Sequence, residues 1–366
     1  MHSITQGIIN DLEKFKKKFP FPFKSRDEKD NFLSSYQNTI EEIQSFCETE
    51  FDWFKSDVLE VKSTFEKIYD LTYRVIQSKL NDDDENAIHL FNILMARYPN
   101  PTNTKKSTVD EASKGSDLSF DSFSSLDPID LFRIRRADWK DGKLRPFEKD
   151  DLFHIKYHDR RKCKNYRFSI SGIPALYLGE SIEICEHEVF NGGDLFKYYI
   201  SQFTSRELLN VITIDFPDLI IWNLKHGGFN GTALRFFAYL PFSSACLFKT
   251  APPHNRPFNP EYIIPQMLMS FIKKNTKLDG VRYPSTKFIY DGKTKPVLNY
   301  AFPVKDPDEK GFCKNLTNIF DWIAPVLSEI DYVKMKNDLS ESAGKIEMSE
   351  DLKRLRGEFG SIIKSS

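Results

Sequence analysis

The spacing of apolar residues changes near residue 128, and this change most limits the folds open to the chain. Before it, segments such as 31–54 and 57–80 carry apolar residues at intervals of three and four, which indicates amphipathic helices. After it come short apolar runs bounded by Gly, Pro, Asp and Asn, which are typical of strands. These runs are DLFRIR, DLFHIKY, PALYLG, NVITIDF, ACLFK, DGVRYPS and PVLNYAFPV.

Helix-like segments at 181–190, 194–204 and 261–274 interrupt the predicted strands without a steady βαβ alternation. This order favours an α+β fold over a doubly wound parallel sheet. The predicted organisation has four parts. They are a helical N-terminal domain over 1–105, a polar linker or mobile loop over 106–127, a mixed-sheet domain over 128–330, and a polar tail or helix over 331–366.

The charge balance argues against some classes of partner. A formal net charge of −1 gives no global field that favours nucleic acid or an anionic membrane surface. The five cysteines are dispersed, with no CxxC pair, which predicts reduced thiols in a cytoplasmic protein. The start of the chain lacks the apolar region of a signal peptide, and no long apolar run predicts a membrane span.

Common catalytic motifs are missing from the sequence. There is no Walker A or GxSxG motif, and HEVF at 187–190 lacks the second His that a zinc protease needs one turn later. No Cys/His pair has zinc spacing, so we expect no metal. A basic run at 158–164, HDRRKCK, fits either a solvated surface or a phosphate contact.

Several motifs in a fixed order carry a resemblance to a known family. YRFSISGIPALYLG is followed by EHE, and later by EYIIPQMLMSF and DGVRYPSTK. Over roughly 128–304 the chain resembles the RES domain, whose characterised members are NAD-destroying toxins of bacterial toxin–antitoxin pairs. The resemblance implies a mixed, split β-sheet like that of ADP-ribosyltransferases, with NAD as the substrate and no metal.

The resemblance also assigns candidate site residues. The family's arginine before an aromatic residue falls on Arg167, and the tyrosine ten residues later falls on Tyr177. The glutamate eleven residues further falls on Glu188, the serine of the Asp-Gly strand end falls on Ser285, and the arginine of the first strand resembles Arg133.

Two departures from the family pattern concern the substrate more than the fold. Compact members carry Gly before the motif arginine, whereas this chain has Tyr166. The segment between Glu188 and Ser285 is also long, and 215–231 reads as an insertion.

The choice of glutamate is open on physical grounds. Helical periodicity places Glu186 closer than Glu188 to the apolar face of the 181–190 segment. Family spacing selects Glu188, and a catalytic carboxylate belongs at the rim of a buried stripe, so we assign Glu188. The alternative is that both are solvated helix charges.

The residue types suit NAD chemistry. Breaking the nicotinamide–ribose bond develops oxocarbenium charge, which a carboxylate such as Glu188 can stabilise. Guanidinium groups donate paired hydrogen bonds to phosphate oxygens, so Arg133 and Arg167 are candidates for the pyrophosphate. The resemblance further assigns Tyr177 to stacking on the nicotinamide or closing the pocket, and Ser285 to orienting the ribose or a phosphate.

The acceptor stays open at this point. Water gives a NAD glycohydrolase, inorganic phosphate a NAD phosphorylase, and a protein side chain a mono-ADP-ribosyltransferase. The basic run offers Arg160, Arg161, Lys162 and Lys164 for phosphate. A non-catalytic binding or regulatory module on a RES scaffold is the alternative from a different class, although the full residue set argues against it.

A protein inhibitor is also expected, because the resemblance implies a partner that covers the active-site cleft. It is either a separately encoded antitoxin or the N-terminal domain itself.

Overall fold

The computed structural model describes residues 2–24, 31–56, 60–98, 123–126, 128–140, 142–189, 196–228, 230–250, 258–288, 290, 292 and 294–330. Its N-terminal part is helical, as the sequence predicts. The helices are α1 (His2–Lys18), α2 (Phe32–Glu50), η1 (Asp52–Lys55), α3 (Val61–Leu80) and α4 (Asp84–Arg97). Side-chain caps fix two helix starts, since Asn31 accepts from the Ser34 N–H and Asp83 from the Asn86 N–H.

The rest of the described chain is built on a mixed sheet, so the α+β class is confirmed. Nine of the described strands form one sheet, in the order β1-β7-β8-β9-β5-β2-β6-β10, with β11 also paired to β6. Among the described strands of this sheet, β7 and β8 form the one parallel pair, and the other pairs are antiparallel. The strands are β1 (Phe123–Leu126), β2 (Asp130–Arg136), β5 (Ala175–Gly179), β6 (Phe196–Ser205), β7 (Leu209–Thr213), β8 (Gly280–Tyr283), β9 (Asn299–Pro303), β10 (Phe320–Trp322) and β11 (Val326–Ile330).

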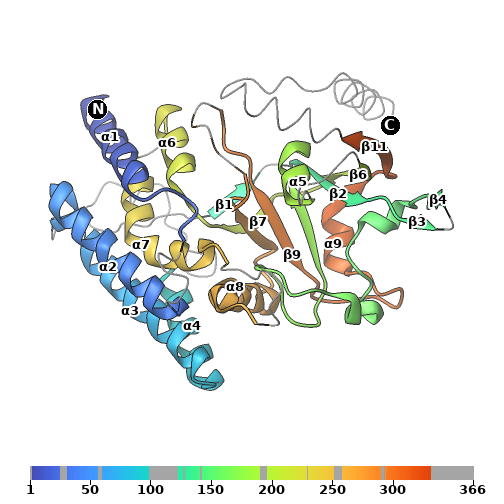
Figure 1. The fold of residues 1–366 in the computed structure, drawn as a ribbon, viewed down its shortest axis with the longest axis horizontal. Coiled ribbons are helices and arrows are strands. Elements are labelled where there is room, and N and C mark those ends of the chain that lie inside the picture. Colours follow the sequence, from blue (N-terminus) through green and yellow to red (C-terminus); the bar gives the residue numbers. More distant parts are fainter. Residues whose placement is uncertain are drawn as a thin grey trace.

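The remaining elements connect and cover these strands. They are the hairpin β3 (Trp139–Lys140) and β4 (Lys143–Leu144), the 3-10 helices η4 (Lys149–Leu152), η5 (Tyr157–Lys162) and η6 (Pro260–Tyr262), and helices α5 (Ile182–Val189), α6 (Pro217–Lys225), α7 (Gly231–Leu247), α8 (Ile263–Lys274) and α9 (Lys314–Ile319). The hairpin projects away from the N-terminal helices, at the far side of the sheet (Figure 1).

The shortest strand pairing in the described sheet is the one between β5 and β2. These strands share a single register pair, Phe132 with Gly179, whereas β5 pairs with β9 along its whole length and β2 with β6 along its whole length. Helix α5 packs directly on this junction, because a Cβ at Gly179 would lie 2.6 Å from the Cys185 sulfur. The two halves of the sheet can therefore diverge beyond the junction, as a split sheet requires.

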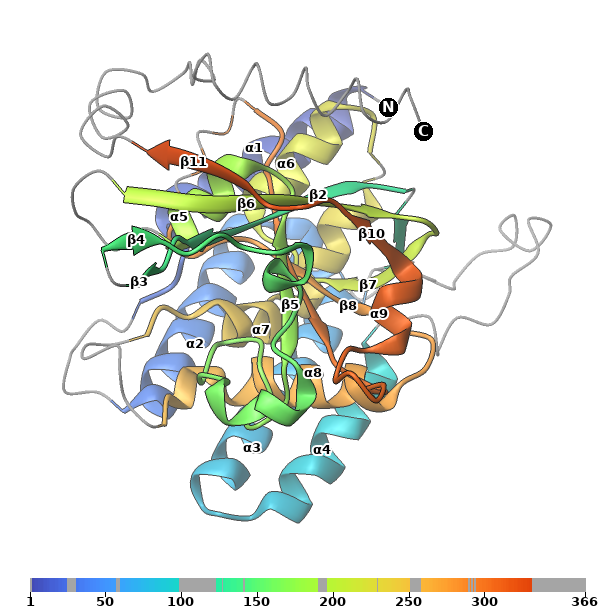
Figure 2. The same ribbon diagram turned by 90° about the vertical axis from the view of Figure 1, so that its right-hand side faces the viewer.

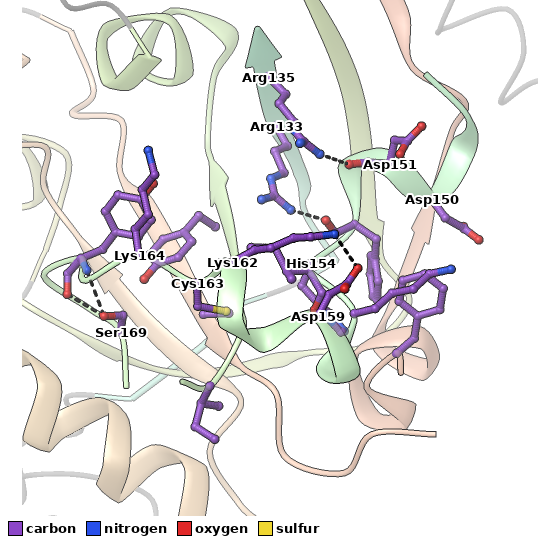
Figure 3. A pocket seen from close by; sticks show the side chains of 18 of the residues that line it. Arg133, Arg135, Asp150, Asp151, His154, Asp159, Lys162, Cys163, Lys164 and Ser169 are labelled. Carbon is purple, nitrogen blue, oxygen red and sulfur yellow. Dashed lines mark hydrogen bonds and ion pairs between the residues drawn. The ribbon is translucent and has the colours of Figure 1, made fainter. Parts of the chain in front are cut away.

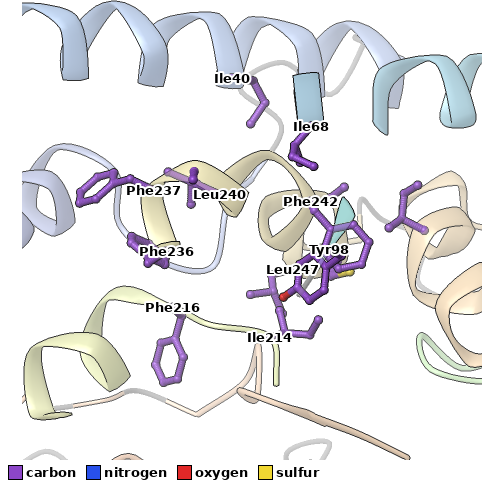
Figure 4. Packing of buried hydrophobic residues seen from close by; sticks show 14 of the residues in the cluster. Ile40, Ile68, Tyr98, Ile214, Phe216, Phe236, Phe237, Leu240, Phe242 and Leu247 are labelled. Atoms are coloured by element: carbon purple, nitrogen blue, oxygen red, sulfur yellow. The ribbon is translucent and has the colours of Figure 1, made fainter. Parts of the chain in front are cut away.

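Helices α6, α7 and α8 lie between the N-terminal helices and the sheet (Figures 1 and 2). One apolar cluster joins all of these layers, and Phe15 of α1 belongs to it. Figure 4 shows two other members, Ile68 of α3 and Phe237 of α7. Buried hydroxyls add cross-links: Tyr36 donates to the Pro241 carbonyl, and Tyr98 to that of Thr213. The N-terminal helices thus share their core with the sheet region.

The predicted domain boundaries stay predictions. Within the predicted linker, 123–126 form β1, and the remainder of 106–127 lies outside the described residues, as does the predicted tail from 331 to 366.

Three local predictions were wrong. The segment 194–204, predicted as a helix, contains most of strand β6, whose successive apolar residues are buried on both faces and so imitate a buried helix. ACLFK lies mostly within α7, and DLFHIKY spans the end of η4 and the loop after it. The interpretation of 215–231 as an insertion stays a prediction; the segment contains α6 and the first residue of α7, two helices that contact the N-terminal helices.

None of the helices in the described ranges is long and apolar enough to cross a bilayer.

Candidate active site

A cleft of about 640 Å3 opens where β2 and β5 diverge. Strand β2 contributes Arg133 and Arg135 to its walls, and β5 contributes Ala175 and Tyr177. Most of the remaining lining residues come from the chain between these strands, including η4 and η5 (Figure 3). The cleft therefore lies beside the short β5–β2 junction and is lined mainly by the chain that connects these two strands.

Basic side chains outnumber acidic ones around the cleft. Six Arg and Lys residues line it against three aspartates. Arg145 pairs with Asp151 at 2.8 Å and Lys162 with Asp159 at 2.8 Å, which leaves a basic surplus. A basic surplus in a concave site attracts an anionic ligand.

Arg133 is held toward the cleft by backbone carbonyls. Its Nη1 donates to the carbonyl oxygens of Leu152 at 2.9 Å and Phe153 at 2.6 Å (Figure 3). Burial lowers its pKa to about 10, so the guanidinium stays charged near neutral pH. Two bonds on one nitrogen leave other N–H groups of the fork for a ligand.

Two tyrosines meet at one wall of the cleft. Tyr177 donates from its hydroxyl to the Phe168 carbonyl at 2.5 Å, and its ring meets the Tyr166 ring edge-on at a centroid distance of 5.7 Å. Tyr166 is 50% exposed, although Ser169 fixes its backbone by bonding to both its N–H and its carbonyl. A fixed backbone with an exposed ring offers a flat surface to a ligand.

Arg167 lies beside the cleft-lining residues and points elsewhere. Its Nη1 donates to the Cys246 carbonyl of α7 at 3.0 Å, and its guanidinium lies 5.1 Å from the Tyr262 ring centre. Burial lowers its pKa. In this arrangement Arg167 ties the segment before β5 to the helices behind it.

Glu188 and Ser285, far apart in sequence, are in direct contact. The Ser285 hydroxyl donates to Glu188 Oε1 at 2.5 Å, and Asn299 Nδ2 donates to the same oxygen at 2.9 Å. Glu188 Oε2 lies 3.5 Å from Lys287 Nζ, and the Glu188 side chain stays 35% exposed. One carboxylate oxygen is therefore fixed by two donors, and the other faces the Lys287 ammonium in a side chain that is partly exposed.

Ser285 is itself fixed from several sides. It is 0% exposed, and its hydroxyl oxygen accepts from the backbone N–H groups of Lys287 and Phe288 at 3.1 and 3.2 Å. With its proton directed at Glu188, this hydroxyl acts on the carboxylate.

Sheet register connects this cluster to the cleft. Tyr177 of β5 lies opposite Ala301 of β9, and Asn299 lies opposite both Gly179 of β5 and Tyr283 of β8. Asn299 is thus a diagonal neighbour of Tyr177 on the same face, and such neighbours lie about 7–8 Å apart. That separation is within the length of one nucleotide.

Tyr283 lies among the predicted residues. Its ring packs on Phe168 at a centroid distance of 4.2 Å. Burial raises its pKa well above the ordinary value, and the nearby Tyr177 and Glu188 act in the same direction while Arg167 opposes them. Tyr283 therefore lies close to three members of the predicted set.

Glu186 faces the interior, as helical periodicity predicts. It is 7% exposed and accepts a hydrogen bond from the Tyr198 hydroxyl at 2.8 Å. Burial raises its pKa to about 7. Glu188, in contrast, has a partly exposed side chain that is bonded to the polar side chains of Ser285 and Asn299.

The basic run divides between cleft and surface. Lys162 and Lys164 line the cleft, whereas Arg160 folds over Tyr157, with its guanidinium 5.0 Å from that ring centre. The cleft also contains His154, whose Nε2 accepts from the Cys313 N–H and whose Nδ1 meets the Ile155 carbonyl. Burial lowers the His154 pKa to about 4, so this imidazole is neutral at pH 7.

The structure thus joins Glu188 to Ser285 and places Arg133 beside Tyr177, while Arg167 lies to one side. Sequence reasoning did not identify Asn299, Tyr283 or His154 as site residues. Asn299 carried no motif, and only the pairing of β9 with β5 and β8 reveals it. Among the described residues no group of three or more His, Cys, Asp or Glu side chains is arranged to hold a metal ion.

Comparison with known proteins places the chain in a family. It is 33% identical over 214 residues to "Putative toxin YopC" of Bacillus subtilis (strain 168), a match that covers 55% of this chain and 47% of that protein. The chain therefore spans about half the length of this curated relative. No solved structure matches the chain. The family model of the RES domain matches residues 130–315, which include Arg133, Tyr177, Glu188 and Ser285, and the chain belongs to the RES-domain family.

Proposed function

We propose that this chain is a toxin-like enzyme that cleaves the nicotinamide–ribose bond of NAD and so depletes NAD. The observation that carries the proposal is the Glu188 carboxylate, which Ser285 and Asn299 fix through one oxygen, while the other oxygen lies near Lys287 and the side chain is partly exposed. Glycosidic cleavage needs a carboxylate held beside the anomeric carbon, and this cluster provides one next to a basic cleft.

Each side chain then has a distinct role. Arg133 and the surplus of basic residues bind the pyrophosphate, and Tyr177 with Tyr166 contacts a planar ring. As the C1′–N bond breaks, its electron pair leaves with nicotinamide, and the charge that develops on the ribose faces Glu188. Ser285 serves Glu188 and not the substrate, because its hydroxyl is buried and already bonded.

The acceptor completes the reaction at C1′. An oxygen of water or inorganic phosphate forms the new bond, giving ADP-ribose or its 1″-phosphate, and the proton of that oxygen passes to solvent or to a nearby base. Lys162 and Lys164 at the cleft support phosphate as an acceptor, because both are cationic and line it. Protein mono-ADP-ribosylation is the runner-up within the same chemistry.

A toxin role brings a partner with it. The relative's name describes a toxin, and we propose a cytoplasmic protein inhibitor that covers the cleft of this chain as well. The alternative in which the N-terminal helices cover the cleft finds no support in the described residues, since none of those between 2 and 98 lines it.

Product analysis tests the proposed function. The purified chain is incubated with NAD, with and without phosphate, and the products are separated by mass spectrometry. We expect loss of NAD and release of nicotinamide with ADP-ribose or its phosphate ester. A covalent ADP-ribose adduct on protein would favour the runner-up, and intact NAD under both conditions would overturn the enzyme reading in favour of a binding module.

A further inference from the structure

The loop after β8 connects Ser285 to the N-terminal part of the chain. The Ser285 backbone N–H donates to the Tyr290 hydroxyl at 3.0 Å, and that hydroxyl donates to the Val297 carbonyl at 3.0 Å. Tyr290 thus joins both ends of the loop that follows the strand. Because the same serine holds Glu188, any displacement of Tyr290 reaches the carboxylate through two hydrogen bonds.

Tyr290 is in turn held by a stack of aromatic rings. Its ring packs on Phe216 at a centroid distance of 4.8 Å, and Phe216 packs on Phe21 at 5.4 Å. Phe216 is almost fully buried and directly precedes α6, beneath α7 in Figure 4. On the other side, Phe288 meets both Tyr290 and His187, the residue before Glu188.

Ion pairs fasten the same two layers. Lys16 of α1 pairs with the buried carboxylate of Asp218 in α6, and Glu13 of α1 pairs with Lys225 at the end of α6. Gly292 lies next to the first pair, since a Cβ at this position would lie 3.7 Å from Lys16 Nζ and 3.8 Å from Asp218 Oδ1. Helix α1 and its following segment are therefore connected to the Ser285 loop in two places: through Phe216, which packs on both Phe21 and Tyr290, and through the Lys16–Asp218 pair beside Gly292.

We propose that α1 and the segment after it, as far as Phe21, position the catalytic carboxylate. Through Phe216 and Tyr290 this part of the chain holds Ser285 in the place where the serine orients Glu188. This inference rests on the proposed function and gives the N-terminal helices a role opposite to inhibition. Neither Phe21 nor Tyr290 belongs to the residues that line the cleft, so their effect is on the placement of Glu188.

Single substitutions along this path, with one matched control, test the inference. Tyr290→Phe keeps the ring and removes the hydroxyl that links Ser285 to Val297. Phe21→Ala removes the N-terminal ring, and Phe46→Ala is its matched control. Phe46 is also a partly buried N-terminal phenylalanine of the same cluster, but its ring neighbours are Phe19 and Phe51.

We expect Tyr290→Phe and Phe21→Ala to lower kcat for NAD about tenfold with KM nearly unchanged, because small misplacements of a catalytic group cost rate. Phe21→Leu restores part of the loss. Phe46→Ala should have little effect on kcat, even if this variant loses as much melting temperature as Phe21→Ala does. When Phe21→Ala and Tyr290→Phe are combined, the loss of kcat should be smaller than the product of the two single losses, because both substitutions act on one path.

Hydrogen exchange at the Ser285 amide gives a readout that does not depend on NAD. We expect faster exchange in peptides covering this amide for Phe21→Ala and Tyr290→Phe, but not for Phe46→Ala. If the wild type consumes no NAD yet exchange changes in this pattern, the proposed function fails and the positioning path stands. Equal behaviour of Phe21→Ala and Phe46→Ala, or a loss confined to KM, overturns the inference.

Discussion

The Glu188 cluster and the basic cleft are assembled in opposite ways. Glu188, Ser285 and Asn299 come from three separate elements, and each is fixed by hydrogen bonds within the cluster. The cleft comes mostly from one continuous stretch between β2 and β5, and several of its side chains are exposed. Fixed geometry suits bond breaking, whereas exposed charge and a flat ring suit capture of an anion. Substitutions in the first should therefore reduce turnover, and substitutions in the second should weaken binding.

The largest expected effect separates the two glutamates of α5. Glu188→Gln should reduce kcat by roughly 10²–10⁴-fold, the range for loss of a catalytic carboxylate. Glu186→Gln should change it only a few-fold, because that side chain is buried against Tyr198. Steady-state NAD loss measures both. A Glu186→Gln variant as inactive as Glu188→Gln would reverse the assignment.

A smaller loss is expected from the residues that fix Glu188. Ser285→Ala and Asn299→Ala each remove one donor to Glu188 Oε1 and should lower kcat by roughly 10–100-fold, through misplacement of the carboxylate. KM should stay within about twofold, since neither residue lines the cleft. Thr286→Ala removes the neighbouring hydroxyl and serves as the control. A rise in KM without a fall in kcat would show that these side chains bind substrate directly.

The exposed ring of the cleft should matter for binding. Tyr166→Ala removes an aromatic surface worth about 0.5–1.5 kcal/mol, so KM should rise roughly two- to tenfold while kcat changes little. Trp139→Ala removes a ring that is 63% exposed but does not line the cleft, and it should leave KM unchanged. Equal effects of the two substitutions would remove Tyr166 from the binding surface.

A smaller change in KM should distinguish the lysines of the basic run 158–164 from its arginines. The double substitution of Lys162 and Lys164 to Ala should raise the KM for NAD or phosphate by about fivefold or less, and salt should reduce the difference. The same double substitution of Arg160 and Arg161 is the control, because neither lines the cleft. If both pairs behave alike, the charge acts as a general field and not through the cleft.

Substitution of Glu186 should change activity least, and its main effect should be on how the free energy of unfolding depends on pH. Its folded pKa of about 7 lies above the ordinary value of 4.5, so the folded state binds more protons between those values. Its contribution is therefore fully present below pH 4.5 and is lost as pH rises through 7. Glu186→Gln should flatten this dependence and stabilise the chain above pH 7, whereas Glu183→Gln should not. Denaturant titrations from pH 5 to 8 measure the slopes.

How much the sequence could predict differs between these same regions. The order of motifs indicated the family, and helical periodicity placed Glu186 inside and Glu188 at the rim, because both signals are local. The segment 194–204 was mistaken for a helix because burial of β6 on both faces removes the alternation that marks a strand.

Contacts between residues far apart in the sequence could not be predicted from the sequence alone. Asn299 belongs to the cluster only because β9 pairs between β5 and β8, and no spacing along the chain reports that pairing. Arg167 was predicted beside the substrate by its motif, whereas its guanidinium contacts Cys246 and Tyr262, residues of segments that tertiary packing brings together. The predicted role of Arg167 in binding pyrophosphate stays a prediction.

NAD affinity of Glu188→Gln tests the central claim most directly, because that claim separates binding in the cleft from chemistry at the cluster. Calorimetry on this variant should give a Kd within about threefold of the wild-type KM, while NAD turnover by the same preparation falls at least about a hundredfold. Unchanged turnover, or a loss of turnover fully explained by a lost ability to bind NAD, would contradict it.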